Sequence, residues 1–81
     1  INMTNYTSSN KTKSTEYTYF VATAVNSKDN STSKQLFREH FATVEVYNMH
    51  NGHFVENTNY VPIRTHFISS SFDSALSYHL R

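Results

Sequence analysis

The sequence lacks cysteine altogether and contains a single glycine and a single proline. The absence of cysteine excludes disulfides, thiolate chemistry and zinc sites with Cys ligands. Because small secreted animal domains commonly depend on disulfides, a bacterial or viral source fits better. No Gly-rich phosphate loop, H-E-x-x-H pair or nucleophile elbow is present. Only six acidic residues occur, and no two of them stand at a spacing that suggests a pair of catalytic carboxylates. A carboxylate-driven enzyme is therefore not indicated.

Charged residues are also scarce, at 16% of the chain, well below the usual quarter. Seven Lys and Arg against six Asp and Glu give a formal net charge of +1. That balance excludes a strongly basic nucleic-acid binder and an acidic DNA mimic. Ser, Thr and Asn take the place of charge, which favours a secreted or viral location. No run of 18 apolar residues occurs, so no membrane span is predicted.

The length allows one domain with one core. Residues 1–16 are almost entirely polar and are predicted to form a flexible arm or an edge strand, whereas 17–81 are predicted to form a single α+β domain. Hydrophobic residues make up 37% of the chain, a lean supply that six Tyr and six Phe partly offset. A core of this size is marginal on its own, so we expect a protein partner or self-association.

Strands are predicted at 17–25, 43–49, 53–58 and 61–69, where β-branched and aromatic residues are concentrated. A final helix is predicted from a cap at Ser70 or Ser71 through Leu80. The segment 34–42 is predicted to be helical, with Ser33 as its cap. Its apolar positions share one helical face, but the same segment also fits a strand.

A helix over 34–42 gives the order β-α-β-β-β-α, a small antiparallel sheet with two short helices. This order resembles a ferredoxin-like unit that lacks its last strand, and such a likeness carries no function. Pro62 cannot donate to a ladder and so predicts an edge strand over 61–69. Asn51-Gly52 predicts a two-residue type I′ hairpin turn.

Two histidines flank that turn. In a two-residue turn His50 and His53 would lie opposite each other, with Cβ atoms about 5 Å apart. Two imidazoles so placed can hold a transition metal only with a third ligand, and none is fixed nearby in the sequence. We therefore expect neither a metal site nor a cofactor.

Arg64 and His66 lie two residues apart, so on a strand they share one face. Their pairing would suit a metal-independent ribonuclease, with His for proton transfer and Arg for the phosphate. His40 is a candidate second histidine. Arg38 and His40 repeat the spacing, but the pair diverges if the segment 34–42 is helical.

Other side chains suggest modification or binding. The pattern N-x-[ST] marks four glycosylation candidates: Asn2, Asn5, Asn10 and Asn30. Apolar residues on both faces of the predicted strands suggest a binding surface unless a helix covers it. The candidate binding residues are Tyr47, Met49, Phe54, Ile63 and Phe67.

These patterns favour a non-enzymatic protein-binding or assembly module that acts through a sheet face or an edge strand. The alternative is a small metal-independent ribonuclease or toxin domain. A further alternative is one chain or fragment of a larger secreted or viral assembly.

Overall fold

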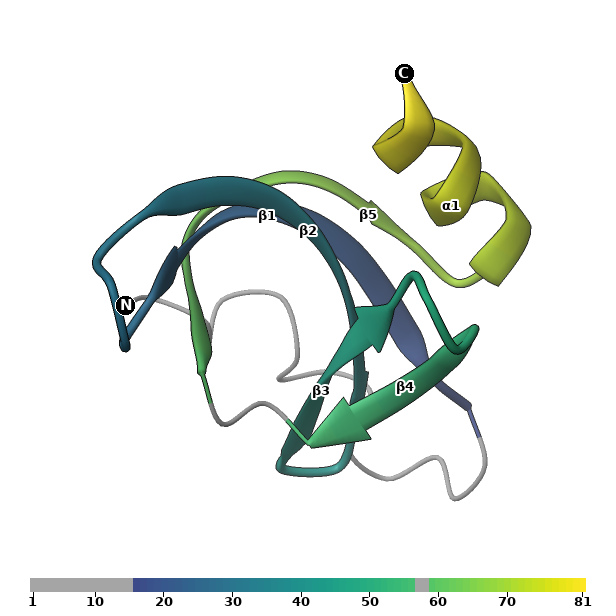
Figure 1. The fold of residues 1–81 in the computed structure, drawn as a ribbon. Helices are drawn as coiled ribbons and strands as arrows, with labels where there is room; N and C mark the ends of the chain where they lie inside the picture. Colours follow the sequence, from purple (N-terminus) through teal and green to yellow (C-terminus); the bar gives the residue numbers. More distant parts are fainter. Residues whose placement is uncertain (1–15, 57–58) are drawn as a thin grey trace.

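A computed structural model of the protein describes residues 16–56 and 59–81, which form one sheet and one helix (Figure 1). The described strands form an antiparallel sheet in the order β4-β3-β2-β1-β5. Strands β1 to β4 are a meander, and β5 returns to pair with β1. The elements are β1 (Thr18–Asn26), β2 (Thr32–His40), β3 (Thr43–Asn48), β4 (His53–Glu56), β5 (Tyr60–Ser69) and α1 (Phe72–Leu80).

The predicted helix over 34–42 is wrong, because residues 34–40 belong to strand β2 and 41–42 form the turn that follows it. The β-α-β start and the likeness to a ferredoxin-like unit are lost with it. Strand β2 pairs on one side with β1 and on the other with β3. This pairing sends Leu36 and Phe37 to opposite faces of the sheet, and both are buried. A helix would have placed both on one face, so burial on two faces overrode the local pattern.

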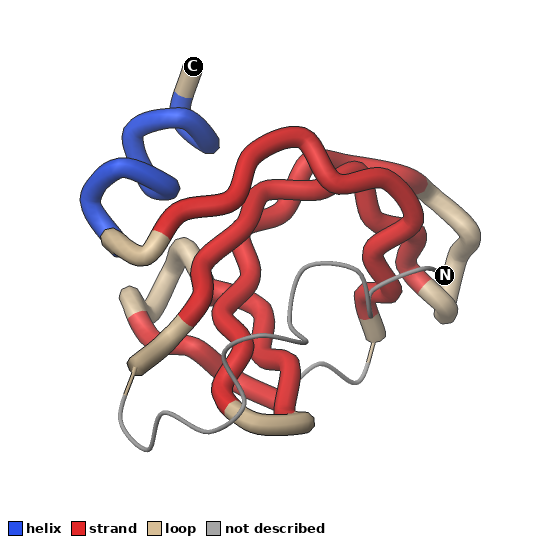
Figure 2. Tube along the Cα trace, turned by 180° about the vertical axis from the view of Figure 1, so that it is seen from behind, coloured by secondary structure: helices blue, strands red, loops and turns tan. Residues whose placement is uncertain are grey.

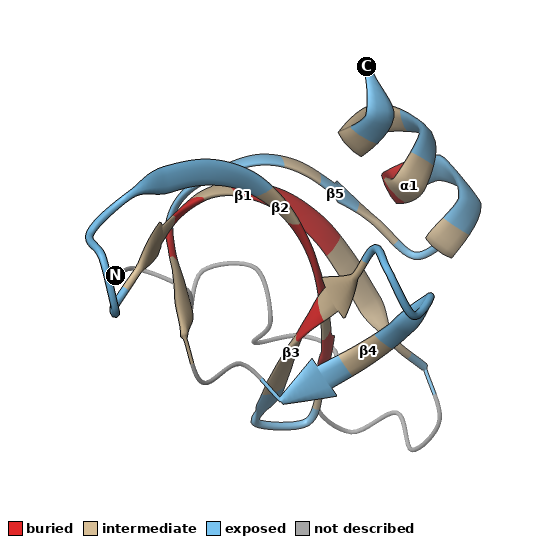
Figure 3. Cartoon of the chain, viewed as in Figure 1, coloured by how far each residue is buried: buried red, intermediate tan, exposed pale blue. Residues whose placement is uncertain are grey.

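The sheet is strongly bent, and α1 lies on the outside of the bend (Figure 2). The inner face carries a buried cluster of Phe20, Ala22, Ala24, Phe37 and Val46. A single cross-strand row runs through this face from Val55 through Val46, Phe37 and Phe20 to Ile68. Its three central members are buried, whereas Val55 and Ile68 on the two end strands are exposed (Figure 3).

The outer face is covered by α1. Ala75 of the helix is buried against Val21 and Leu36, and a ring of aromatic side chains surrounds this contact. The helix begins as predicted: the Ser71 hydroxyl oxygen accepts a hydrogen bond from the Ser74 backbone N–H. In the described part of the chain, no helix has the length and apolarity needed to cross a membrane.

The hairpin of β3 and β4 is confirmed, but its two-residue type I′ turn is wrong. Asn48 pairs with His53, which leaves a four-residue loop over 49–52. The Asn48 side-chain oxygen accepts hydrogen bonds from the backbone N–H groups of His50 and Asn51, and the Gly52 N–H donates to the Asn48 carbonyl. Only Gly52 in this loop has a positive φ, of 70°. The hydrogen bonds of the Asn48 side chain thus make Asn48 the strand partner of His53, whereas the Asn-Gly pattern predicts His50, two residues later.

Strand β5 lies at one end of the sheet, as Pro62 predicts. No described strand pairs with its outer edge. Its pairing with β1 shifts register twice, between Val21 and Ala22 and between Thr23 and Ala24. Such bulges bend and twist a strand and can re-aim its side chains.

Candidate binding groove at the edge of the sheet

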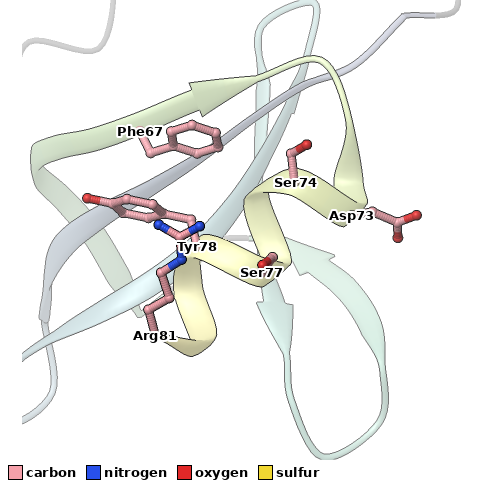
Figure 4. A pocket seen from close by; sticks show the side chains of 6 residues that line it. All are labelled: Phe67, Asp73, Ser74, Ser77, Tyr78 and Arg81. Carbon is pink, nitrogen blue, oxygen red and sulfur yellow. The ribbon is translucent and has the colours of Figure 1, made fainter.

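A groove of about 500 Å³ lies between Phe67 of β5 and a largely exposed stripe of α1 (Figure 4). Its lining residues are Phe67 from β5 and Asp73, Ser74, Ser77, Tyr78 and Arg81 from the helical segment. The helical members follow a spacing of three to four residues, so they form one stripe along the helix. The groove therefore has a strand on one side and a helix on the other.

The floor of the groove is aromatic. The rings of Phe67 and Tyr78 are stacked, with centroids 4.8 Å apart and planes inclined by 15°. Phe67 lies opposite Val21 on β1 and therefore faces α1. Both rings are only partly buried. They leave an apolar surface beside the outer edge of β5.

Charges of opposite sign lie at the two ends of this groove. Asp73 stands in the first turn of α1, and Arg81 follows its last residue. Lys34 of β2 and Arg81 both approach Tyr78, each with its charged group 5.7 Å from the ring centroid. Arg64 belongs to the same end, because Lys34 and Arg64 flank Thr23 in one cross-strand row.

The structure places the ribonuclease candidates apart. His66 is exposed, and its Nε2 lies 2.7 Å from the Thr23 hydroxyl. His40 instead packs between Tyr17 and Phe41, with ring centroids at 4.8 and 4.2 Å. Tyr17 and Thr23 are six residues apart in sequence, a separation of about 20 Å at strand rise. His40 therefore does not converge with Arg64 and His66, and the ribonuclease function stays an untested prediction.

The predicted binding residues divide into three groups. Tyr47 and Phe54 pack against Phe72 of α1, at ring centroid distances of 5.3 and 5.8 Å, so the helix covers them. Met49 in the β3–β4 loop and Ile63 on β5 are about half exposed, at 50% and 52%. Phe67 alone of the five lines the groove.

The hairpin histidines do not form the predicted cross-strand pair, because His53 pairs with Asn48. Across the described ranges 16–56 and 59–81, no group of three His, Asp or Glu side chains could hold a metal ion. Among the glycosylation candidates, Asn30 is exposed in the β1–β2 turn with φ 61°. Asn2, Asn5 and Asn10 lie outside the described residues.

In the β1–β2 turn, the pKa of one carboxyl group lies below its usual value. Hydrogen bonds from the Ser31 hydroxyl and backbone N–H lower the pKa of Asp29, which is fully exposed. These bonds close the turn locally.

Several groove residues escaped the sequence analysis. Asp73 and Tyr78 lie on the predicted final helix, on the stripe opposite its apolar face, and Arg81 directly follows that helix. Lys34, which contacts the Tyr78 ring, lies in the segment predicted to be helical, and that helix does not form. A signal existed for Tyr78 and Arg81, which lie three residues apart and so share one side of a helical segment that follows the predicted edge strand.

No family model, no curated protein and no solved structure matches the chain.

Proposed function

We propose that the chain is a non-enzymatic protein-binding module that adds an extended segment of a partner protein to the outer edge of β5. The observation that carries the proposal is the position of this strand. It is ten residues long, it lies at the end of the sheet, and no described strand occupies its outer edge. An edge strand presents backbone N–H and C=O groups that another chain can pair with.

Two further features support strand addition at β5 rather than at β4. Strand β4, at the other end of the sheet, has only four residues, too few for a long ladder. Strand β5 exposes Ile63 and Ile68, at 52% and 46%, and so offers apolar contacts beside its backbone groups. The basic side chains of β5 are Arg64 and His66, fewer charged groups than a protected edge strand usually carries.

The test is binding of a neutral nine-residue peptide of alternating Thr and Val with one central Phe, followed by NMR of the β5 amides. We expect the peptide to slow hydrogen exchange along β5, and we expect a version with prolines at alternate positions not to bind. Thr65→Lys, a charge in the middle of the exposed edge, should weaken binding.

Thr32→Lys is the matched control, because it adds the same charge at an exposed position of the interior strand β2. Equal loss of binding in both variants would show that charge alone is responsible and would contradict strand addition. Equal binding of the proline peptide would contradict it as well. Light scattering of the free chain would report any pairing between two copies at the same edge.

A further inference from the structure

The groove beside β5 is acidic at one end and basic at the other. Eight residues separate Asp73 from Arg81, about 12 Å along a helix. The helix begins near Tyr19, whose partner on β5 is Ser69, and ends near Lys34, whose row reaches Arg64. Strand β5 therefore runs from the basic end of the groove to the acidic end, antiparallel to α1.

Two cations, Lys34 and Arg81, lie at the basic end, and Arg64 belongs to the same cross-strand row as Lys34. Lys34 and Arg81 hold their charged groups beside the Tyr78 ring. The ion pair that the described residues form is Arg38 with Glu45, on the β3 side of the sheet, so within those residues no carboxylate pairs with these three cations. Asp73 provides the opposite charge at the far end.

We infer that this groove selects an extended peptide segment that carries acidic side chains at one end and an apolar or aromatic side chain ahead of them. The inference rests on the proposed function, because strand addition to β5 brings a partner's side chains over the groove. The apolar side chain would contact the stacked rings of Phe67 and Tyr78. The acidic side chains would face Lys34, Arg64 and Arg81.

The dimensions fix the spacing and the order of these side chains. A strand rises about 3.3 Å per residue, so the 12 Å between the charged ends corresponds to roughly four residues. A segment added antiparallel to β5 runs from the acidic end of the groove to the basic end. Its acidic residues therefore follow its apolar residue in sequence.

A peptide suits the site better than a nucleic-acid strand. The outer edge of β5 offers both donors and acceptors, and a peptide backbone matches both. A phosphodiester backbone supplies acceptors alone, and Asp73 would repel it. The three cations by themselves would attract either polymer, so the experiment must include both.

The experiment measures fluorescence anisotropy with three labelled probes at low salt. The first two are nine-residue Thr-Val peptides with a central Phe, ending in two Glu or in two Lys. The third is an octamer of oligouridylate. We expect the Glu peptide to bind at least about 10-fold more tightly than the Lys peptide. Arg64→Glu and Arg81→Glu, each alone, should remove this preference.

Lys28→Glu is the matched control, since it reverses an exposed charge in the β1–β2 turn, outside the groove. It should leave the preference unchanged. Circular dichroism would establish that each variant is folded. Tyr78→Ala should weaken binding of the peptide with Phe but not of a peptide with Ala in place of Phe. Together these measurements form a double-mutant cycle that isolates the ring contact.

Equal affinities for the Glu and Lys peptides would overturn the selectivity, while the neutral-peptide test would still decide strand addition by itself. Tighter binding of oligouridylate than of the Glu peptide would overturn the inference in favour of nucleic acid. Loss of the preference in the Lys28→Glu control would show that net charge, not the groove, causes it.

Discussion

The inner face of the sheet and the face beneath α1 use different residues for different tasks. The inner face combines two phenylalanine rings with small aliphatic side chains, and Phe20 and Phe37 stack there with centroids 5.0 Å apart and planes inclined by 10°. Both side chains are fully buried. The outer face is richer in rings, but among the residues that the structure describes only Val21, Leu36 and Ala75 are buried there. Its aromatic side chains are only partly buried, so the inner face contributes mainly stability and the outer face also supplies surface.

The outer face also mixes charge with its rings. The Arg38 guanidinium lies 4.4 Å from the Tyr17 ring centroid and 4.5 Å from that of Phe54. Its Nε and Nη2 both donate to one Glu45 carboxylate oxygen, at 2.8 and 2.7 Å. Such a group is compatible with a partly wet surface and not with a dry core.

The largest expected effect is that of Phe20→Ala on the inner face. Removal of a fully buried ring should destabilise the fold by about 3–5 kcal/mol, a large share of the stability of a small domain. Urea denaturation followed by circular dichroism measures the loss. If the variant does not fold, Phe20→Leu provides the comparison, with an expected loss of about 1.5 kcal/mol. A wild-type midpoint in either variant would contradict the role of this face.

Phe72→Ala on the outer face should cost less, about 2 kcal/mol, because its ring is partly exposed. This ring contacts Tyr19, Tyr47 and Phe54 and anchors the start of α1. Urea denaturation measures the loss of stability. NMR should show the spectral changes concentrated in α1 and in the aromatic side chains of the outer face. A loss equal to that of Phe20→Ala would remove the distinction between the two faces.

Arg38→Lys keeps the charge on the outer face but loses the planar fork that stacks on two rings and donates twice to Glu45. We expect a loss of about 1 kcal/mol. Lys28→Arg, an exposed change in the β1–β2 turn, should stay within about 0.5 kcal/mol of the wild type. If the midpoint shifts equally in both variants, the stacked arrangement of Arg38 contributes nothing specific.

A comparably small effect is expected in the loop beside the outer face. Gly52→Ala should cost about 1 kcal/mol, because Gly52 has φ 70°, where a side chain is strained. The added Cβ would meet only the Tyr47 hydroxyl, at 3.6 Å, an ordinary contact. The cost is therefore local to the backbone, and thermal denaturation should show a lower Tm with unchanged aromatic signals. Altered Tyr47 signals would place the effect in the packing of the outer face instead.

The sequence by itself determined where the secondary-structure elements lie more fully than whether each is a helix or a strand. Strands, the edge position of β5 and the Ser71-capped helix follow from β-branched runs, from Pro62 and from capping chemistry, all of which act within a few residues. The groove could be predicted only in part: Phe67 was a candidate, and its helical wall was not.

Tertiary structure decided what local patterns leave open. Residues 34–42 carry apolar residues at both helical and strand spacing, and only burial of Leu36 and Phe37 on opposite faces favours the strand. Likewise, the row from Lys34 through Thr23 to Arg64 exists because three strands pair in one register. Register depends on contacts between residues distant in sequence, and no short segment of this chain contains that information.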